Sequence, residues 1–396
     1  KSNVEYWEKK LSEETKLKTI EVKPDLTFIG KKETANSFEE TDVLNVSKIQ
    51  NKGSMGNAVS INRFNGNIFI GTVLSGNATA RDTIIIFRST NNGLSFFPIF
   101  SLATPNFAQN TLDMEVISKG DSSYIFTAFD FYFNGVSCCY LFRIREDGDI
   151  FVGYPKNSGN NSIQYRGAKI TSDNANFTDF TYIYFSYEMD SLVSGQIRVN
   201  SKLEVMKSVY NFFFTISDCY QGSSGQYGYN IGGGAPAAYE FETDIAYVNT
   251  SSNINQLYTV TVVRGVPGAF SDGTGLYFTR SNDYGVTQPT LFAVTNDIKL
   301  KKSPRIASTG YRDNSLTVVT NRLFSNGDWD PYNFLTNDIT VSAPTFNNAF
   351  VTTSTDTTLT VSVAARYRSY NSYIFGYSDY ITVGPTRYAN VFINTL

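Results

Sequence analysis

The stretch Gly275-Leu-Tyr-Phe-Thr-Arg-Ser-Asn-Asp-Tyr-Gly-Val-Thr-Gln288 indicates the fold of this chain. Its β-branched and aromatic residues from Leu276 to Arg280 are typical of a strand, and Thr290 to Val294 is typical of a returning strand. Asp283 and Gly285 stand between them and favour a tight turn. The stretch therefore predicts one β-hairpin with a specific turn.

The turn of this hairpin has residue types that fix a backbone conformation. An Asp in a turn accepts hydrogen bonds from backbone N–H groups two or more residues on, Gly permits a positive φ, and Ser and Thr hydroxyls bond the nearby backbone. The residues concerned are Ser281, Asp283, Gly285 and Thr287. A weaker copy follows the predicted strand Thr83 to Arg88 and consists of Ser89, Asn91, Gly93, Ser95 and Phe96.

Both turns resemble the Asp-box, or BNR repeat, with the pattern Ser-x-Asp-x-Gly-x-Thr, which marks the sialidase-like β-propeller superfamily. The resemblance implies a β-propeller with the two turns at equivalent places on the outer rim of two blades. The first turn lacks the aromatic residue that usually follows the Thr, because Gln288 stands there. The second has Asn91 in place of Asp and Ser95 in place of Thr, while Phe96 supplies the aromatic residue.

Length and composition favour a closed repeat architecture. A chain of 396 residues is too long for one compact core of ordinary size. Aromatic residues make up 15% and charged residues 17%, and this low charge with abundant Asn, Ser and Thr is typical of a β-rich protein. Short strands and turns recur in units of about fifty to sixty residues with no helices between them, which excludes βαβ units.

The predicted fold is all-β, a six-bladed and possibly seven-bladed β-propeller with a short N-terminal helical extension. Residues 1–50 form the extension, with a helix and possible ring-closing strands, and residues 51–396 form the propeller. Closure of such a ring usually needs strands from both termini in one blade, which removes an exposed edge. We therefore expect Tyr388 to Ile393 to pair near the N-terminal strands.

The absence of histidine restricts the chemistry that is available. It removes the commonest general base and the commonest metal ligand, so catalysis would depend on carboxylates, Tyr or Arg. No cofactor or metal site is predicted. Cys138, Cys139 and Cys219 lack zinc or redox spacing, and either one long-range disulfide with one buried thiol or three buried thiols fits them. A net charge of −3 gives no footprint for nucleic acid.

The catalytic motifs of sialidases are not matched. The resemblance would imply an arginine triad, a Tyr–Glu nucleophile pair and an Asp acid/base, with the first arginine in a Phe/Tyr-Arg-Ile-Pro motif. Arg63 stands in Ile-Asn-Arg-Phe-Asn instead, and Pro304-Arg305-Ile306 resembles only a strand that opens a blade. The sequence therefore predicts no catalytic residue.

Two segments contain candidate binding residues. Trp329 lies in Asp328-Trp-Asp-Pro-Tyr, which suits either a sugar or calcium loop or a blade connection with a packed Trp. The glycine-rich run from Cys219 to Tyr239 is either a disordered linker or an adaptable contact surface. Its candidate residues are Tyr220, Tyr227 and Tyr229.

The N-terminal segment Asn3 to Lys18 has the apolar spacing of an amphipathic helix, with Val4, Trp7 and Leu11 on one side. So short a helix is marginal in water, so we expect it to dock either on its own propeller or on a partner chain, with Trp7 as the anchor. No apolar run reaches the length of a membrane span. A chain that starts at Lys1 with this composition favours a secreted or cell-surface location.

Two functions fit these observations. The first is a non-catalytic, secreted or cell-surface propeller that binds protein or glycan as a subunit of a larger extracellular assembly. The alternative is a sialidase-like or other carboxylate-dependent glycoside hydrolase. Three arginines that converge with a Tyr and a Glu in the central funnel would favour the enzyme, and an empty or apolar funnel with a large aromatic patch elsewhere would favour the binding protein.

Overall fold

The computed structural model describes most of the chain between Leu44 and Thr395. Outside the described residues lie 1–43, 51–53, 63, 75–81, 105–110, 120–121, 134–135, 148–151, 157–161, 174–179, 194–195, 210–211, 219–239, 250–254, 265–273, 282–289, 296–298, 309–314, 326, 340, 342, 352–357, 366–372, 384–385 and 396. The predicted helix with Trp7, and Tyr220, Tyr227 and Tyr229, therefore fall outside the described residues. Nothing in the described part is helical, and none of it forms a helix long and apolar enough to cross a membrane.

The described residues form six four-stranded antiparallel sheets. Sheet 1 contains β2 (Ser54–Ile61), β3 (Ile68–Leu74), β4 (Asp82–Ser89) and β5 (Phe97–Thr104). Sheet 2 contains β6 (Leu112–Lys119), β7 (Ser122–Phe133), β8 (Val136–Arg145) and β9 (Val152–Lys156). Sheet 3 contains β10 (Ile163–Ser172), β11 (Phe180–Val193), β12 (Gln196–Val209) and β13 (Phe212–Asp218).

The remaining sheets follow the same order along the chain. Sheet 4 contains β14 (Glu240–Asn249), β15 (Asn255–Arg264), β16 (Thr274–Ser281) and β17 (Thr290–Thr295). Sheet 5 contains β18 (Lys301–Ser308), β19 (Leu316–Leu323), β20 (Trp329–Thr336) and β21 (Asn347–Phe350). Sheet 6 contains β22 (Thr358–Ala365), β23 (Tyr373–Val383) and β24 (Thr386–Thr395), and its fourth strand is β1 (Leu44–Gln50).

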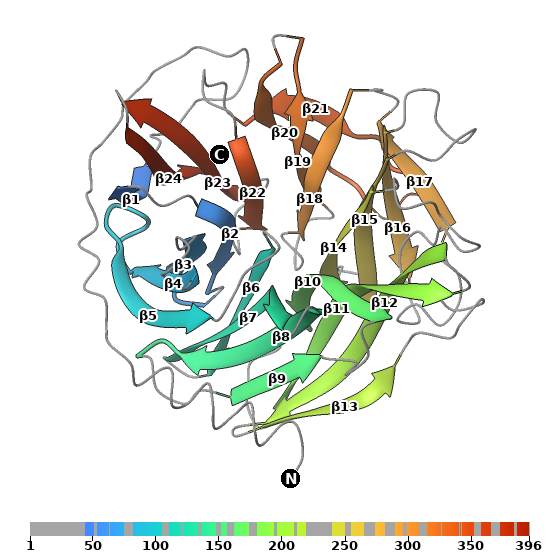
Figure 1. The fold of residues 1–396 in the computed structure, drawn as a ribbon, viewed down its shortest axis with the longest axis horizontal. Coiled ribbons are helices and arrows are strands. Elements are labelled where there is room, and N and C mark those ends of the chain that lie inside the picture. Colours follow the sequence, from blue (N-terminus) through green and yellow to red (C-terminus); the bar gives the residue numbers. More distant parts are fainter. Residues whose placement is uncertain are drawn as a thin grey trace.

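The sheets surround a central axis, as in a β-propeller (Figure 1). The first strand of each sheet is the inner one, and β2, β6, β10, β14, β18 and β22 contact one another in that order and close the ring. Strand β1 completes the last sheet, with Leu44 opposite Ile393 and Gln50 opposite Tyr388. The expected pairing of Tyr388 to Ile393 with an N-terminal strand is confirmed.

Hydrophobic clusters of the described residues lie between successive sheets around the ring. The cluster between sheets 1 and 2 contains Ile84, Ile86 and Phe129, and the cluster between sheets 4 and 5 contains Phe278 and Val318. Residues on both faces of a strand are buried where neighbouring sheets cover it, so the apolar run from Ile84 to Phe87 in β4 is buried throughout. The core is therefore distributed around the axis, which leaves the axis itself for polar side chains.

Two sequence predictions in these strands were wrong. The sequence from Gln196 to Val199 and from Leu203 to Met206 favours two strands with a polar turn between them, but both segments belong to one continuous strand, β12. Its polar Glu204 is buried because Tyr154, Tyr187 and Lys156 all donate to its carboxylate. The segment that begins at Asp328 is a strand rather than a loop, because β20 starts at Trp329.

The two turns singled out in the sequence occupy equivalent places in the topology. Ser89 to Phe96 joins β4 to β5, and the second turn joins β16 to β17, in each case the third strand to the fourth. In the first turn Asn91 Oδ1 accepts the backbone N–H of Ser95 at 2.9 Å, and Ser89 Oγ accepts that of Gly93 at 2.9 Å. Residues 282–289 of the second turn lie outside the described residues.

Candidate functional site

Four charged side chains from consecutive inner strands meet at the axis of the ring. Asp113 comes from β6, Lys169 from β10, Asp244 from β14 and Arg305 from β18. Their charges alternate in sign around the axis, and all four interact electrostatically. A buried charge is tolerated only where opposite charges and hydrogen bonds compensate it, so this arrangement holds the charges together.

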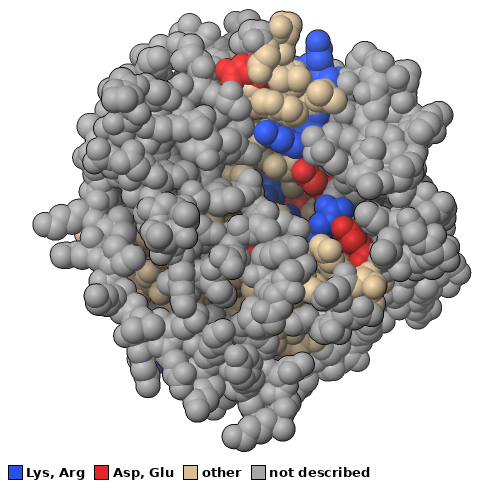
Figure 2. Space-filling model, in the orientation of Figure 1, with Lys and Arg blue, Asp and Glu red and all other residues tan. Residues whose placement is uncertain are grey.

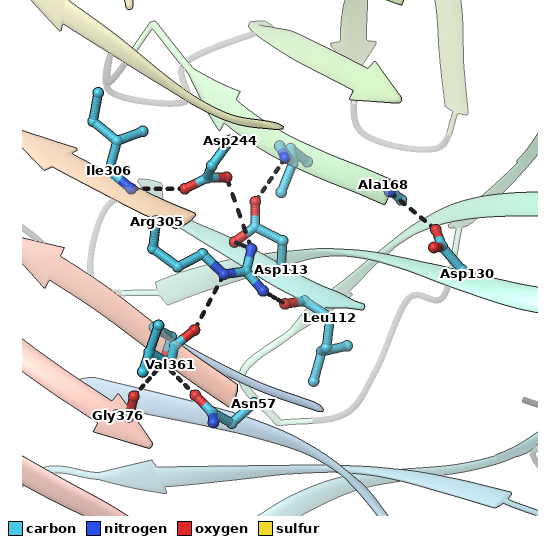
Figure 3. Close-up of polar contacts among 12 residues, drawn as sticks. Asn57, Leu112, Asp113, Asp130, Ala168, Asp244, Arg305, Ile306, Val361 and Gly376 are labelled. Carbon is cyan, nitrogen blue, oxygen red and sulfur yellow. Dashed lines mark hydrogen bonds and ion pairs between the residues drawn. The ribbon is translucent and has the colours of Figure 1, made fainter. Parts of the chain in front are cut away.

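The guanidinium of Arg305 crosses the axis and joins four sheets (Figure 3). It donates to the carbonyl oxygen of Leu112 at 2.7 Å on the inner strand opposite, and to that of Val361 at 3.2 Å. Its Nη1 lies 3.5 Å from Asp113 Oδ1 and 3.7 Å from Asp244 Oδ1. The planar, branched guanidinium reaches all these partners at once, which a lysine ammonium cannot do.

Each of the two aspartates also accepts a backbone N–H of the next sheet. Asp113 Oδ2 accepts the N–H of Ile170 at 2.8 Å, and Asp244 Oδ2 accepts the N–H of Ile306 at 2.8 Å. One oxygen of each carboxyl thus holds neighbouring sheets together. The other oxygen faces Arg305 and the axis (Figure 3).

The strands that carry Lys169 and Arg305 contain two copies of one short segment. Arg166-Gly-Ala-Lys-Ile170 and Lys302-Ser-Pro-Arg-Ile306 both read basic, small, any residue, basic, Ile. In both copies the strand register shifts between the two basic residues, which is a β-bulge. The second position has a left-handed backbone in both, with φ of 68° at Gly167 and 52° at Ser303. The bulges therefore direct the second basic residue of each copy toward the axis.

Carboxylates of the preceding sheet satisfy the backbone N–H groups that each bulge leaves unpaired in the strand. Asp130 accepts the N–H of Gly167 at 2.7 Å and that of Ala168 at 2.9 Å. Glu242 accepts the N–H of Ser303 in the second copy. Together with Asp113 and Asp244, these carboxylates give both copies the same environment. The two copies are therefore alike in the carboxylates that accept their backbone N–H groups as well as in their sequence.

Burial raises the pKa of several carboxyl groups around this centre. It raises the pKa of Asp244 to about 7, with a further contribution from the Asp113 charge, although Arg305 and Lys169 act in the opposite direction. Burial also raises the pKa of Asp113, against the opposing charges of Arg305 and Lys169. It raises the pKa of Glu188 to about 8, against Arg166 and Lys169. The centre therefore holds carboxyl groups that retain a proton near neutral pH.

A cavity of about 60 Å³ adjoins Arg305, and all six inner strands line it. Its charged lining residues are Asp113, Glu115, Asp244 and Arg305. Among the described residues, Arg305 Nη1 and Asp244 Oδ1 are buried without a hydrogen-bond partner. The cavity is well below the roughly 300–1,000 Å³ of pockets that enclose whole ligands, so it has room for only a small polar group.

One face of the molecule is hollowed near its centre. Figure 2 shows Lys or Arg side chains next to Asp or Glu side chains in this hollow, over the region of the inner strands in Figure 1. The centre of the ring is thus charged, but one arginine, Arg305, lines its cavity, and not the three arginines with a Tyr and a Glu that the sequence analysis associated with an enzyme.

The structure places the sequence-predicted site residues away from this centre or outside the described residues. Trp329 is half-buried at the start of β20, with Lys302 Nζ 4.2 Å from its ring centroid, so it packs against a basic side chain. Arg63 lies outside the described residues. Cys138 and Cys139 are buried free thiols, which excludes the predicted disulfide alternative for both, and Cys219 lies outside the described residues.

The sequence analysis missed the axial residues, although one signal was present. It noted Pro304-Arg305-Ile306 as a blade-opening strand but did not compare it with Ala168-Lys169-Ile170. The repeated pattern of two basic residues around a small residue would have pointed to both bulges. The sequence analysis predicted no catalytic residue and did not single out Asp113 and Asp244, which the structure brings beside Arg305.

No family model matches the sequence, and no curated protein sequence matches it. Solved structures do share its fold. An α-L-arabinofuranosidase from Fusarium graminearum, bound to an iminosugar inhibitor, has a TM-score of 0.54 and 11% identity over 88% of this chain and 97% of its own. An α-L-arabinanase from Penicillium chrysogenum, complexed with arabinobiose, has a TM-score of 0.52 and 9% identity over 88% and 98%.

These similarities establish the β-propeller fold that the chain shares with enzymes that cleave glycosidic bonds. They overturn the preferred sequence expectation of a non-catalytic binding subunit, because the similar structures are glycoside hydrolases. The charged axial centre agrees with that correction.

Proposed function

We propose that this chain is a carboxylate-dependent glycoside hydrolase whose reaction centre is the axial site of Asp113, Asp244 and Arg305. One observation carries the proposal: two aspartates with raised pKa face the same guanidinium nitrogen, at 3.5 and 3.7 Å. Glycoside hydrolysis requires such a pair, one carboxyl as proton donor and the other as nucleophile or base. Chains with the same fold cleave arabinofuranosides and arabinan, which makes these the first substrates to test.

Asp244 is the proton donor in this scheme. With a pKa near 7 it is protonated in about half of the molecules at pH 7, and its Oδ1 is buried without a hydrogen-bond partner among the described residues. A glycosidic oxygen placed there accepts the proton of Asp244 Oδ1 and a hydrogen bond from Arg305 Nη1. Proton donation to the leaving oxygen is the step that a raised pKa serves.

Asp113 is the ionised partner. The distance between Asp113 Oδ1 and Asp244 Oδ1 is at most the sum of their separations from Arg305 Nη1, which are 3.5 and 3.7 Å. This bound includes the separation of about 5–5.5 Å that is typical of retaining glycosidases and the short end of the inverting range. Asp113 then acts on the anomeric carbon directly or through a water, and Arg305 keeps the two carboxyl groups in position.

The small volume of the cavity sets a condition on this mechanism. A whole sugar ring does not fit in about 60 Å³, so the substrate must approach from the funnel and insert only its reacting part. The exposed fraction of the Asp113 side chain, 16%, compared with 5% for Asp244, supports access from the Asp113 side.

The test is hydrolysis of an aryl α-L-arabinofuranoside and of linear arabinan by the purified chain and its variants. Asp244→Asn keeps an oxygen for the Ile306 N–H but cannot donate the proton, so kcat/KM should fall by about 10²–10⁴-fold. Asp113→Asn should give a similar loss. The matched control is Asp147→Asn, which changes an exposed carboxylate paired with Arg145, and it should keep full activity.

A measurement on the unaltered chain covers the case in which the variants misfold. Because the proton on Asp244 is required, kcat/KM should fall about tenfold per pH unit above about pH 7. Full activity of a folded Asp244→Asn variant, or no turnover of any glycoside by the unaltered chain, would refute the proposal.

A further inference from the structure

Carboxyl groups outnumber basic groups in the lining of the axial cavity. Three carboxyl groups, those of Asp113, Glu115 and Asp244, line it together with one guanidinium, that of Arg305. Lys169 is buried nearby and acts on Asp113 and Asp244 through its charge, without lining the cavity. A ligand that enters therefore meets mostly carboxyl oxygens.

The guanidinium is already occupied by protein groups. Arg305 donates to the carbonyl oxygens of Leu112 and Val361, and its remaining nitrogen Nη1 is buried beside the two aspartates without a hydrogen-bond partner among the described residues. A sugar carboxylate is best bound by a guanidinium that offers two parallel N–H donors. Arg305 cannot supply them without giving up contacts that hold the ring together.

The two unpartnered polar atoms match an uncharged oxygen instead. Arg305 Nη1 is a donor, and Asp244 Oδ1 is an acceptor when ionised and a donor when protonated. A hydroxyl or ether oxygen has two lone pairs, and a hydroxyl also has a proton, so it satisfies both atoms in either state. A carboxylate satisfies Nη1 but would face the carboxyl groups of Asp113, Glu115 and Asp244.

From this charge balance we infer that the axial centre selects uncharged sugars over acidic ones, and that Glu115 is a specificity-determining residue. This inference rests on the proposed function, since it names the substrate class of the same site. Glu115 lies two residues after Asp113 on β6, is half-buried, and accepts the hydroxyl of Ser172 at 2.8 Å. Its charge adds to the repulsion of an acidic sugar without any role in proton transfer.

The test compares binding of matched neutral and acidic probes by saturation-transfer NMR at pH 7. The pairs are methyl galactoside with methyl galacturonide and methyl glucoside with methyl glucuronide, and methyl α-L-arabinofuranoside is a third neutral probe. In at least one pair the neutral member should bind about tenfold or more tightly than the acidic one, the size of one like-charge contact. Glu115→Gln should narrow that ratio at least threefold, because glutamine still accepts from Ser172 but has no charge.

The control variant is Asp147→Asn, which removes an exposed carboxylate elsewhere and should leave the ratio unchanged. Equal or tighter binding of the acidic member, a ratio that Glu115→Gln does not alter, or binding of no probe would overturn the inference. Binding without turnover would refute the proposed hydrolase and keep the selectivity. Hydrolysis of neutral and acidic glycosides at equal rates would support the proposed hydrolase and refute the selectivity.

Discussion

The two bulged segments of the ring, Arg166–Ile170 and Lys302–Ile306, share a backbone plan and differ in what presses against them. In the first copy the Glu188 carboxylate lies directly against the second position, where an added Cβ would meet its Oε2 at 1.6 Å, so that residue is Gly167. In the second copy the same left-handed position is held by Ser303. Both copies therefore require a left-handed backbone at this position, but only the first copy leaves no room for a side chain there.

The second basic residues of the two copies also differ in how they act. Lys169 influences Asp113, Glu188 and Asp244 through its charge, whereas Arg305 in addition donates to main-chain oxygens of the opposite and adjacent inner strands. The first copy thus sets the electrostatic potential of the centre, and the second copy sets its geometry.

The sharpest test of this contrast is Gly167→Ala. The new Cβ at a φ of 68° would displace Glu188, which accepts the buried N–H of Thr243 at 3.0 Å. The free energy of unfolding should fall by about 3–5 kcal/mol, as backbone strain and a lost buried hydrogen bond combine. Gly66→Ala is the matched control, because its φ is 77° with nothing near an added Cβ, and only about 1–2 kcal/mol should be lost. Denaturant unfolding measures both, and equal losses would contradict the contrast.

Arg305→Lys should have the next largest effect. The lysine keeps the charge but not the hydrogen bonds to Leu112 and Val361, so two buried carbonyl oxygens lose their donor and stability should fall by about 2–3 kcal/mol. The same exchange at the half-buried Arg145, which pairs with the exposed Asp147, should change stability by less than about 0.5 kcal/mol. If both variants unfold at the same denaturant concentration, the guanidinium does not hold the sheets together.

The pH dependence of stability distinguishes the carboxyl groups near the two copies. Because burial raises the pKa of Glu188 to about 8, the folded state binds a proton there that the unfolded state releases above its ordinary value of about 4.5. Stability from this group is fully present below about pH 4.5 and is lost as the pH rises to about 8, by up to about 1.4 kcal/mol per unit. Asp244 contributes in the same direction, up to about pH 7.

Glu188→Gln isolates the first copy in that experiment. The variant should lose the stability slope between about pH 7 and pH 8, and below about pH 7 it should keep only the part of the slope that Asp244 contributes. Urea unfolding at intervals of half a pH unit resolves the two windows. A wild-type chain that gains stability between pH 5 and pH 8 would show that these carboxyl groups are ionised at neutral pH.

Ser303→Gly should have the smallest effect, a change of less than about 1 kcal/mol, because relief of the left-handed backbone is offset by the greater freedom of glycine in the unfolded chain. Asn92→Gly, at a φ of 60° in the first Asp-box-like turn, is the comparison. A loss above 2 kcal/mol at Ser303 alone would mean that its side chain, and not its backbone, supports the bulge.

Residue patterns within short segments predicted individual strands and the first Asp-box-like turn. Alternating or continuous apolar runs located strands such as Tyr124 to Phe131, and turn formers located the connection from Ser89 to Phe96. β12 was divided at the polar residues Asn200 to Lys202, but in the structure these residues pair with Tyr187 to Met189 of β11 and the strand continues through them. No local pattern contains that information.

The axial site could not be predicted in the same way. Asp113 and Asp244 look like ordinary polar positions of half-buried strands, and Arg305 bonds to Leu112, which is 193 positions away in the sequence. Their meeting depends on closure of the whole ring. The repeated bulge is the exception, because both copies are visible in the sequence once they are compared, and each places a cation at the axis.

The pairing of β1 with β24 has a consequence for how the molecule is assembled (Figure 1). During synthesis β1 emerges early, yet its partner is the final strand of the described chain, so five sheets can form while their ring is still open. The entropic cost of joining such distant segments grows only with the logarithm of the intervening length. The pairing of β1 with β24 therefore comes late but costs little more free energy than the closure of a shorter loop. Until then Arg305 has no closed axis to cross, and the axial site is complete only when the last sheet closes the ring.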